Sequence, residues 1–249
     1  MSHQLQGKIA LVTGGTTGIG LASAQEFAAQ GATVFITGRR QAELDAAVAS
    51  IGASAIGIRG DVASLDDLDR VYAEIKASAG HLDILFANAG GGDMMALADI
   101  TEEHFDRIFN ANVKGTLFTV QKALPLLRDG SSIILTASTT SVKGTECFSV
   151  YSASKAAVRN FARTWLLDLK PRRIRVNALS PGPVHTPGLA GLAPVEQQQG
   201  LLDHLATVVP IGRLGRPGEV AKAAAFLASD DSSFINGIEL FVDGGTAQI

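Results

Sequence analysis

The sequence predicts an α/β fold built on a doubly wound parallel sheet of about seven strands with helices on both faces. Short apolar runs alternate with stretches of helical hydrophobic spacing along the chain, and a glycine-rich turn joins the first run to the first helical stretch. This alternation predicts parallel strands, because each return to the same edge of a sheet needs a crossover helix. No second domain or internal repeat is evident, so we expect a single domain over residues 1–249.

The composition excludes several classes of protein. Hydrophobic residues make up 46% of the 249 residues and charged residues 18%, which predicts a large core and argues against disorder. A net charge of −3 argues against a nucleic-acid-binding surface. The only cysteine, Cys147, cannot form an internal disulfide and fits a reducing compartment. The polar start MSHQLQGK lacks the apolar core of a signal peptide, and no apolar stretch is long enough to span a membrane, so we expect a cytoplasmic protein.

The first strand, residues 8–13, is followed by a glycine turn that suits a dinucleotide. The turn residues are Gly14, Thr16, Thr17, Gly18, Ile19 and Gly20, and a helix over residues 21–30 follows and is closed by Gly31. Glycines let the backbone approach a pyrophosphate, and a helix N-terminus presents free N–H groups to it. The spacing Gly14-x3-Gly18-x-Gly20 departs from the common G-x-G-x-x-G fingerprint, but the strand–turn–helix context is that of a Rossmann-type fold.

The second strand, residues 32–37, precedes two arginines that indicate the type of dinucleotide. A site for NAD would carry an acidic residue about 20 residues after the glycine turn, and the nearest one, Glu43, already lies in the next helix. Arg39 and Arg40 suit the 2′-phosphate of NADP(H) through forked, charge-assisted hydrogen bonds. The alternative is a solvated helix start that carries two arginines.

The middle of the chain continues the alternation. A helix over 41–51 and a strand over 53–60 lead to Asp61 and Val62. Asp61 either accepts a hydrogen bond from an adenine amino group or starts the next turn. Ser64 and Asp67 resemble a capping box for a helix that ends near Ala79. A strand over 82–87 then meets Asn88, Ala89 and Gly90, where glycines allow close approach to a ligand or only a flexible loop.

The second half predicts a long helix, two more βα units and a final strand. The helix begins at the cap Thr101 and runs to about residue 127, with Asn112 inside it as a core amide or as the holder of a water. Strands follow at 131–137 and 174–180, separated by a helix over about 150–170. The segment 186–215 is rich in Pro, Gly and Gln, and we expect it to be a mobile lid. A helix over 217–229 and a strand over 237–243 complete the chain.

Three polar side chains in the stretch from residue 138 to 155 predict acid–base chemistry. Tyr151 and Lys155 are four residues apart, so on a helix they share one face, and Ser138 ends a buried strand. A lysine ammonium at about 4 Å would lower the pKa of the Tyr151 phenol by as much as about three units from its ordinary value near 10. Ser138 would hydrogen-bond a substrate oxygen. The alternative is a surface tyrosine beside a solvated lysine.

Together these motifs resemble the short-chain dehydrogenase/reductase family, in its main branch of about 250 residues. The matching segments cover nearly the whole chain in the family's order. They are TGGTTGIG (13–20), Asp61-Val62, NAG (88–90), Asn112, Ser138, YSASK (151–155), VNALSPG (176–182) and VDGG (242–245).

The resemblance implies a catalytic tetrad of Asn112, Ser138, Tyr151 and Lys155. Tyr151 would give or take the substrate proton, Ser138 would orient the substrate oxygen, Lys155 would hold the nicotinamide ribose, and Asn112 would position a water. Lowering of the Tyr151 pKa by Lys155 is part of the same implication.

The resemblance also implies the cofactor contacts and the assembly. The implied cofactor residues are those of the glycine turn, Arg39, Arg40, Asp61, Val62, Asn88, Ala89, Gly90, Tyr151, Lys155, Pro181, Gly182, Val184 and Thr186. NADP(H) is expected, with NAD(H) as the alternative. A homotetramer is implied. The C-terminal TAQ resembles bacterial carbonyl reductases, some of which bind magnesium there; we expect no metal in this chain.

The loops near the tetrad predict an apolar substrate pocket with adaptable methionines. Its candidate residues are Met94, Met95, Val142, Phe148, Leu189 and Leu192, each of which is otherwise ordinary core. The leading function is therefore an NADPH-dependent reductase of a small-molecule carbonyl. A 3-oxoacyl-carrier-protein reductase, an NAD-dependent alcohol or sugar dehydrogenase, and a non-catalytic dinucleotide sensor remain alternatives. A basic rim at Arg213 and Arg216 would favour an acidic carrier protein.

Overall fold

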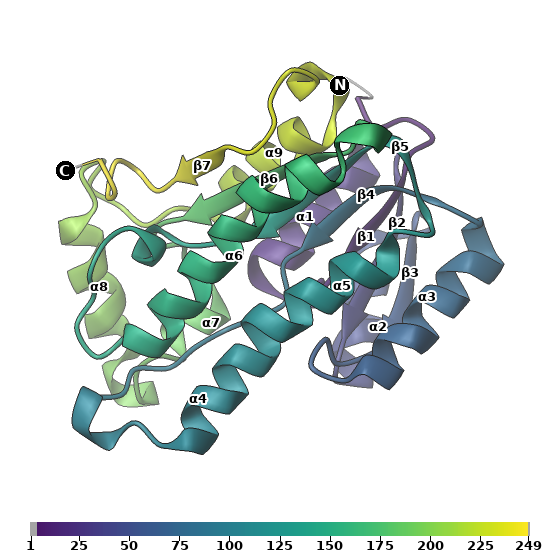
Figure 1. Cartoon of the computed structure of the whole chain (residues 1–249). Helices are drawn as coiled ribbons and strands as arrows, with labels where there is room; N and C mark the ends of the chain where they lie inside the picture. Colours follow the sequence, from purple (N-terminus) through teal and green to yellow (C-terminus); the bar gives the residue numbers. More distant parts are fainter. Residues whose placement is uncertain (1–3, 249) are drawn as a thin grey trace.

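The computed structural model describes residues 4–248 and forms one sheet of seven parallel strands (Figure 1). Residues 1–3 of the polar N-terminal stretch and Ile249 lie outside the described residues. The strand order is β3-β2-β1-β4-β5-β6-β7, which confirms the predicted doubly wound Rossmann-type fold. The strands are β1 (Ile9–Val12), β2 (Thr33–Gly38), β3 (Ala55–Arg59), β4 (Leu82–Ala87), β5 (Leu127–Thr136), β6 (Arg175–Pro181) and β7 (Glu239–Val242).

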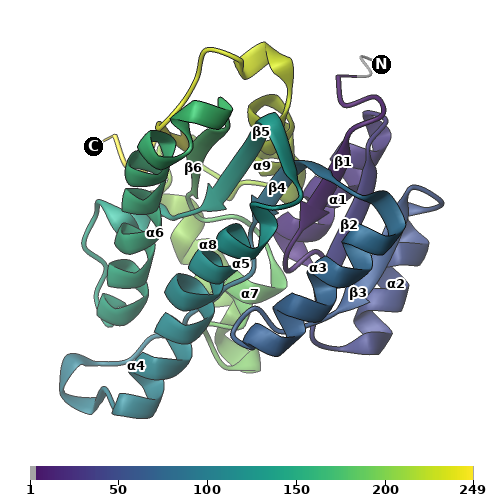
Figure 2. The same ribbon diagram turned by 45° about the vertical axis from the view of Figure 1, so that its right-hand side comes forward.

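Helices cover both faces of the sheet, as Figures 1 and 2 show. One face packs against α1 (Gly18–Ala29), α2 (Gln41–Ile51) and α9 (Pro217–Ala228). The other packs against α3 (Leu65–Ala79), α5 (Gly115–Ala123) and α6 (Ser149–Asp168). The remaining helical segments are α4 (Glu102–Phe109), a π-helical turn (Asn110–Lys114), α7 (Pro187–Ala190), α8 (Gln198–Val208) and short 3₁₀ turns at Leu97–Asp99, Thr139–Ser141, Lys170–Arg172, Val195–Gln197 and Asp230–Ser232.

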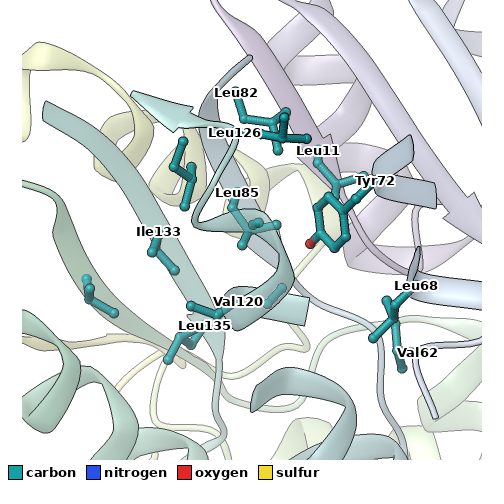
Figure 3. Close-up of a cluster of buried hydrophobic side chains, with 14 of the residues drawn as sticks. Leu11, Val62, Leu68, Tyr72, Leu82, Leu85, Val120, Leu126, Ile133 and Leu135 are labelled. Atoms are coloured by element: carbon teal, nitrogen blue, oxygen red, sulfur yellow. The ribbon is translucent and has the colours of Figure 1, made fainter. Parts of the chain in front are cut away.

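The strands are apolar on both sides because each side faces a helix layer. In β1, Leu11 belongs to the core under α3 and α5, whereas Ala10 and Val12 belong to the core under α1 and α9. Figure 3 shows the first of these cores, where Leu11, Tyr72 and Leu85 pack together. Burial on both sides explains why the strands read as continuous apolar runs rather than alternating ones.

The predicted helix over 101–127 is helical without a break from Glu102 to Ala123, but it ends four residues early and contains a π-helical turn. Thr101 caps α4 as expected, since its side chain accepts a hydrogen bond from the His104 N–H at 3.1 Å. The helix then passes through the π-helical turn and ends at Ala123, and β5 begins at Leu127, four residues earlier than predicted. The sequence of the turn, NANVKG, contains poor helix formers, and tertiary bonds to Asn112 described below hold it.

The Ser64 cap is only half of the predicted capping box. The Ser64 hydroxyl accepts from the Asp67 N–H at 3.3 Å, as a cap should. The Asp67 carboxylate, however, accepts from the Asp61 N–H at 2.8 Å instead of returning to the cap residue. This bond fixes the turn after β3 at the carboxyl edge of the sheet. None of the helices described within 4–248 is long and apolar enough to cross a membrane.

Candidate active site

The glycine turn is folded so tightly that its glycines cannot be replaced. A Cβ at position 20 would lie 2.1 Å from the Gly14 carbonyl oxygen, and Gly14 itself has a φ of 65° and touches Ala89. Thr17 precedes α1 in the N-cap position, yet its side chain makes no capping hydrogen bond. The first N–H groups of α1 therefore remain available to an anionic ligand, and the backbone around them leaves no room for side chains. This arrangement fits a dinucleotide pyrophosphate.

Asn88 fastens the glycine turn to the end of β4. Its side-chain amide donates to the carbonyls of Thr13 at 3.1 Å and Gly14 at 3.3 Å. The Thr13 hydroxyl in turn accepts from the backbone N–H groups of Asn88 and Ala89. Asn88 and Ala89 thus fix the glycine turn to the end of β4. Gly90, with a φ of 157°, follows them and leads to the loop beside Tyr151.

The two arginines after β2 differ in their surroundings. Arg40 forms an ion pair with Glu43 at 2.6 Å, whereas Arg39 has no such partner among the described residues. Both are exposed. Gly38 packs against Thr16, since a Cβ there would meet the Thr16 methyl at 2.3 Å. Arg39 therefore begins directly beside the glycine turn, with its guanidinium free to bind a phosphate.

Asp61 and Val62 lie at the end of β3 on the same edge. One Asp61 oxygen accepts from the Ala63 N–H at 3.0 Å, as the turn-starting alternative predicts. Val62 is buried against Gly115 of α5.

The segment after β6 returns to the glycine turn. Pro181 ends β6, Gly182 packs against Asp243, and Val184 forms an isolated bridge with Gly215. The Thr186 hydroxyl caps α7 by accepting from the Leu189 N–H at 3.1 Å, and the Thr186 methyl lies next to Gly18. The start of the lid therefore contacts the glycine turn.

Ser138, Tyr151 and Lys155 meet at the carboxyl end of β5. The Ser138 hydroxyl lies close enough to the Tyr151 phenol to lower its pKa. The Lys155 Nζ lies 5.6 Å from the centre of the Tyr151 ring and donates to the Thr136 carbonyl at 2.8 Å. Only 4% of Lys155 is exposed, so the solvated-lysine alternative does not describe this chain.

Burial changes the acid strengths of both groups. Desolvation raises the pKa of Tyr151, although the neighbouring Ser138 hydroxyl opposes the rise. Desolvation lowers the pKa of Lys155 from 10.5 to about 8. The expected net lowering of the Tyr151 pKa is therefore wrong, because removing the phenol from water outweighs the influences that lower its pKa. The Lys155 amine is hydrogen-bonded to the Thr136 carbonyl.

Asn112 lies in the π-helical turn, and both ends of its side-chain amide are hydrogen-bonded. Its Oδ1 accepts from the Gly91 N–H at 3.0 Å, and its Nδ2 donates to the Gly91 carbonyl and to the Ser154 hydroxyl, both at 2.9 Å. Ser154 is the neighbour of Lys155 on α6. Asn112 thus joins the loop after β4 to the helix of Tyr151, which satisfies the buried amide.

A pocket of about 530 Å³ lies between this loop and the lid. Of the predicted substrate-pocket residues, Met94 and Leu192 line this pocket, whereas Met95, Val142, Phe148 and Leu189 do not. Phe148 instead stacks on Tyr151, with ring centres 4.4 Å apart, and 47% of Val142 is exposed. The other lining residues are Ala193, Pro194, Glu196, Gln197, Gly200 and Leu201.

Sequence reasoning missed several residues that shape the site. The Thr13 hydroxyl binds the backbone of Asn88 and Ala89, and the Thr136 carbonyl binds Lys155. The only sequence signal for either is that Thr13 precedes the glycine turn. Gly92 touches the Tyr151 ring, and Asp93 is bound by Arg107, 14 residues away. No local spacing reveals such contacts. No group of three His, Cys, Asp or Glu side chains that could hold a metal occurs within residues 4–248.

Comparisons with known proteins agree with this geometry. The family model that matches residues 14–247 is described as enoyl-(acyl carrier protein) reductase. The chain is 50% identical to the oxidoreductase asL5 of Sarocladium schorii, over 99% of this chain and 98% of that protein. It is 36% identical to versicolorin reductase 1 of Aspergillus parasiticus, over 98% of each.

A solved structure extends the likeness to the whole fold. The short-chain dehydrogenase/reductase from Serratia marcescens matches with a TM-score of 0.90 and 31% identity, over 98% of this chain and all of that one. Likeness of this extent, in sequence as well as in fold, places the chain in the short-chain dehydrogenase/reductase family of oxidoreductases.

Proposed function

We propose that the chain transfers a hydride between NADP(H) and a carbonyl or secondary alcohol, with Tyr151 as the general acid and base. The observation that carries this proposal is the meeting of Ser138, Tyr151 and the buried Lys155 at the carboxyl end of β5, with the Lys155 amine 5.6 Å from the centre of the tyrosine ring. The group is built at the edge of the sheet that also carries the glycine turn. A bound nicotinamide dinucleotide would supply or accept the hydride.

The chain's own groups manage the proton. The raised pKa of Tyr151 keeps its hydroxyl protonated at neutral pH, so it can donate to a carbonyl oxygen. Ser138 orients that oxygen. Lys155, with a pKa of about 8, is mostly charged at pH 7 and stabilises the phenolate that forms. Asn112 fixes the loop that borders these groups, since its amide is bonded on both sides.

The choice of NADP(H) rests on Arg39. Its guanidinium has no ion pair within the described chain, it lies beside the glycine turn, and no acidic residue occupies the position that binds ribose hydroxyls in NAD sites. Arg40 is already bound to Glu43 and contributes less. The glycine turn, Asp61, Val62, the segment 88–90 and the segment from Pro181 to Thr186 are proposed as the other contacts of the bound cofactor.

The charges near the lid favour a small apolar substrate over a carrier-bound acyl chain. Arg213 donates to both oxygens of Glu219, at 2.9 and 2.7 Å, and Arg216 lies 3.5 Å from the same carboxylate. Glu219 therefore offsets one of the two positive charges of the basic rim expected for an acidic carrier protein. The pocket beside the lid carries Glu196 and no basic residue. An uncharged ketone is the proposed substrate class.

Replacement of Tyr151 tests the proposal. Tyr151→Phe should retain NADPH binding and lose at least about 10²-fold in kcat, the usual contribution of a general acid. The assay is NADPH and NADH oxidation with an acetoacetyl thioester, a β-keto ester, an aryl ketone and a diketone. The matched control is Tyr72→Phe, because Tyr72 is the only other tyrosine and its hydroxyl donates to the Thr119 carbonyl inside the core. Full activity of Tyr151→Phe would refute the mechanism.

A further inference from the structure

We propose that Asp93, held by Arg107 and His104 of α4, is a positioning residue for Tyr151. It fastens residues 91–95, here called the strap, across the tyrosine ring. This inference rests on the proposed function, because it gives the strap its purpose at the general acid.

The strap touches Tyr151 through a backbone with no side chain. A Cβ at Gly92 would lie 2.4 Å from Cδ2 of the Tyr151 ring and 2.8 Å from Cγ. Any other residue at position 92 would therefore displace the ring or the strap. This close approach means that the position of the strap determines the position of the ring.

The strap is fastened on both sides of Gly92. On one side, both backbone groups of Gly91 are bonded to the Asn112 amide, at 3.0 and 2.9 Å. On the other side, the Asp93 carboxylate receives Arg107 Nη2 at 2.8 Å and Nη1 at 3.3 Å. Asn112 and Arg107 belong to consecutive parts of one helical segment, so α4 and the π-helical turn hold the strap as a unit.

His104 adds a buried group to an anchor whose Asp93 and Arg107 side chains are 45% and 56% exposed. Its side chain is only 4% exposed, and its Nε2 lies 3.3 Å from Asp93 Oδ1, a close contact without hydrogen-bond geometry. The Arg107 guanidinium holds the pKa of Asp93 below its usual range, so the carboxylate stays charged at neutral pH. No role in the proposed proton transfer accounts for a buried histidine that is directed at this carboxylate.

The far end of the strap is tied to the segment that leads into the Tyr151 helix. The Met95 N–H donates to the Cys147 carbonyl at 2.7 Å. Cys147 has a φ of 56°, which a side-chain-bearing residue rarely adopts, and the next residue, Phe148, stacks on the Tyr151 ring. The strap and the Cys147 turn thus confine the same ring, and Met94, between the anchors, faces the pocket.

The test uses Asp93→Ala and, as an independent removal of the same contact, Arg107→Ala. Each should lower kcat about tenfold and leave the KM for NADPH within about twofold, because the cofactor loop is fastened separately by Asn88 and Thr13. The double variant should be no worse than either single one. Arg107→Lys, which keeps the charge but not the fork, should recover part of kcat.

A spectroscopic readout separates positioning from general damage. The chain has two tyrosines, so protein carrying ¹³Cζ-tyrosine gives two NMR signals, and Tyr151→Phe identifies one of them. Without the anchor, water should reach the ring, so the Tyr151 signal should move and its titration midpoint should fall. The control is Asp129→Ala, which removes a similar exposed pair with Arg172 far from the site and should change neither signal nor kcat.

An unmoved Tyr151 signal in both Asp93→Ala and Arg107→Ala would overturn the inference, whatever happens to kcat. A moved signal with wild-type kcat would also overturn it, since the ring position would then not matter. The NMR measurement needs no turnover, so its outcome is independent of the proposed function. That function would fail instead if Tyr151→Phe stayed active.

Discussion

At the scale of single residues, the chemistry of the site is set by burial as much as by neighbours. Lys155 is carried four residues after Tyr151 on α6, but its amine reaches the Thr136 carbonyl rather than the phenol. Both groups lose contact with water, and the neutral form of each becomes easier to maintain. The Tyr151 phenol is consequently protonated at neutral pH and can donate a proton. The pKa of the Lys155 amine, about 8, lies close to neutral pH.

The buried ammonium predicts an unusual dependence of stability on pH. Lowering the Lys155 pKa from 10.5 to about 8 corresponds to about 3 kcal/mol, at about 1.4 kcal/mol for each pKa unit. Between these two pH values the unfolded chain binds more protons than the folded one, so this group makes the unfolding free energy rise with pH. Below pH 8 the cost of burying the charge is fully present.

Lys155→Met should therefore stabilise the fold at pH 7 by about 1 to 3 kcal/mol while removing activity. The gain should shrink by pH 10, where the wild-type amine is neutral. Urea unfolding at pH 7 and pH 10 measures both values. An equal difference at the two pH values would show that the ammonium is not penalised by burial.

Arg39 predicts the cofactor preference. Arg39→Asp should weaken the binding of NADPH at least about tenfold relative to that of NADH, since a charge-assisted hydrogen bond contributes about 1.5–3 kcal/mol. Arg40→Asp should have a smaller effect, because Arg40 is already paired with Glu43. Titration of each variant with both cofactors, followed by fluorescence of the single tryptophan, measures the change. Equal weakening by the two variants would argue against a specific phosphate contact by Arg39.

At the scale of elements, the segment from Thr101 to Ala123 illustrates how tertiary bonds change the winding of a helix at one turn. The sequence predicts one long helix because its apolar spacing continues on both sides of Asn112. In the structure, the Asn112 amide bonds Gly91 and Ser154, and the helix widens into a π-helical turn at this position. Such turns occur frequently at functional sites. The helical segment places His104, Arg107 and Asn112 along the strap.

The lid is the other element that departs from regular alternation. Helix α8 has one fully buried residue, Leu202, whereas α6 has five. Local opening is easier where fewer apolar contacts must be broken. Amide hydrogen exchange should therefore be faster in α8 than in α6, and NADPH should slow it near Thr186, which contacts the glycine turn. Equal protection of the two helices would exclude a mobile lid.

At the scale of the whole molecule, the parallel sheet gathers distant residues at one edge. The strand order places β1 and β4 side by side, so the glycine turn and Asn88 meet at the point where the order of the strands reverses. Residues from β5, α6 and the segment after β6 join the same edge. Figure 2 shows α7 and α8 beside this end of the sheet. Gly200 and Leu201 of α8 line the pocket.

The outer surface of α4 carries an exposed aromatic pair, and we propose that it takes part in a homotetramer. Phe105 is 43% exposed and stacks on Phe109. On the neighbouring α6, Phe161 stacks on Trp165, and both are partly buried against the core. Exposed aromatic side chains such as Phe105 can mark interaction surfaces. We expect a mass of about 103 kDa in solution, four times the 25.8 kDa of one chain.

Phe105→Asp should lower that mass by placing a charge in the interface. Leu97→Asp is the control, because Leu97 is 82% exposed but lies outside both helices. Light scattering after size-exclusion chromatography measures the mass of both variants and of the wild type. A wild-type mass equal to that of one chain would exclude the tetramer.

The sequence by itself determined the α/β class, the alternation of strands and helices, and the positions of the glycine turn, Ser138, Tyr151 and Lys155. These features follow from local patterns: hydrophobic spacing, turn residues and short motifs. Only the tertiary structure decided the direction of the Tyr151 pKa shift, the partner of Lys155, the π-helical turn at Asn112 and the contact of Gly92 with the tyrosine ring. Each of these depends on which groups lie across space and on how much water they exclude, and neither quantity is carried by spacing along the chain.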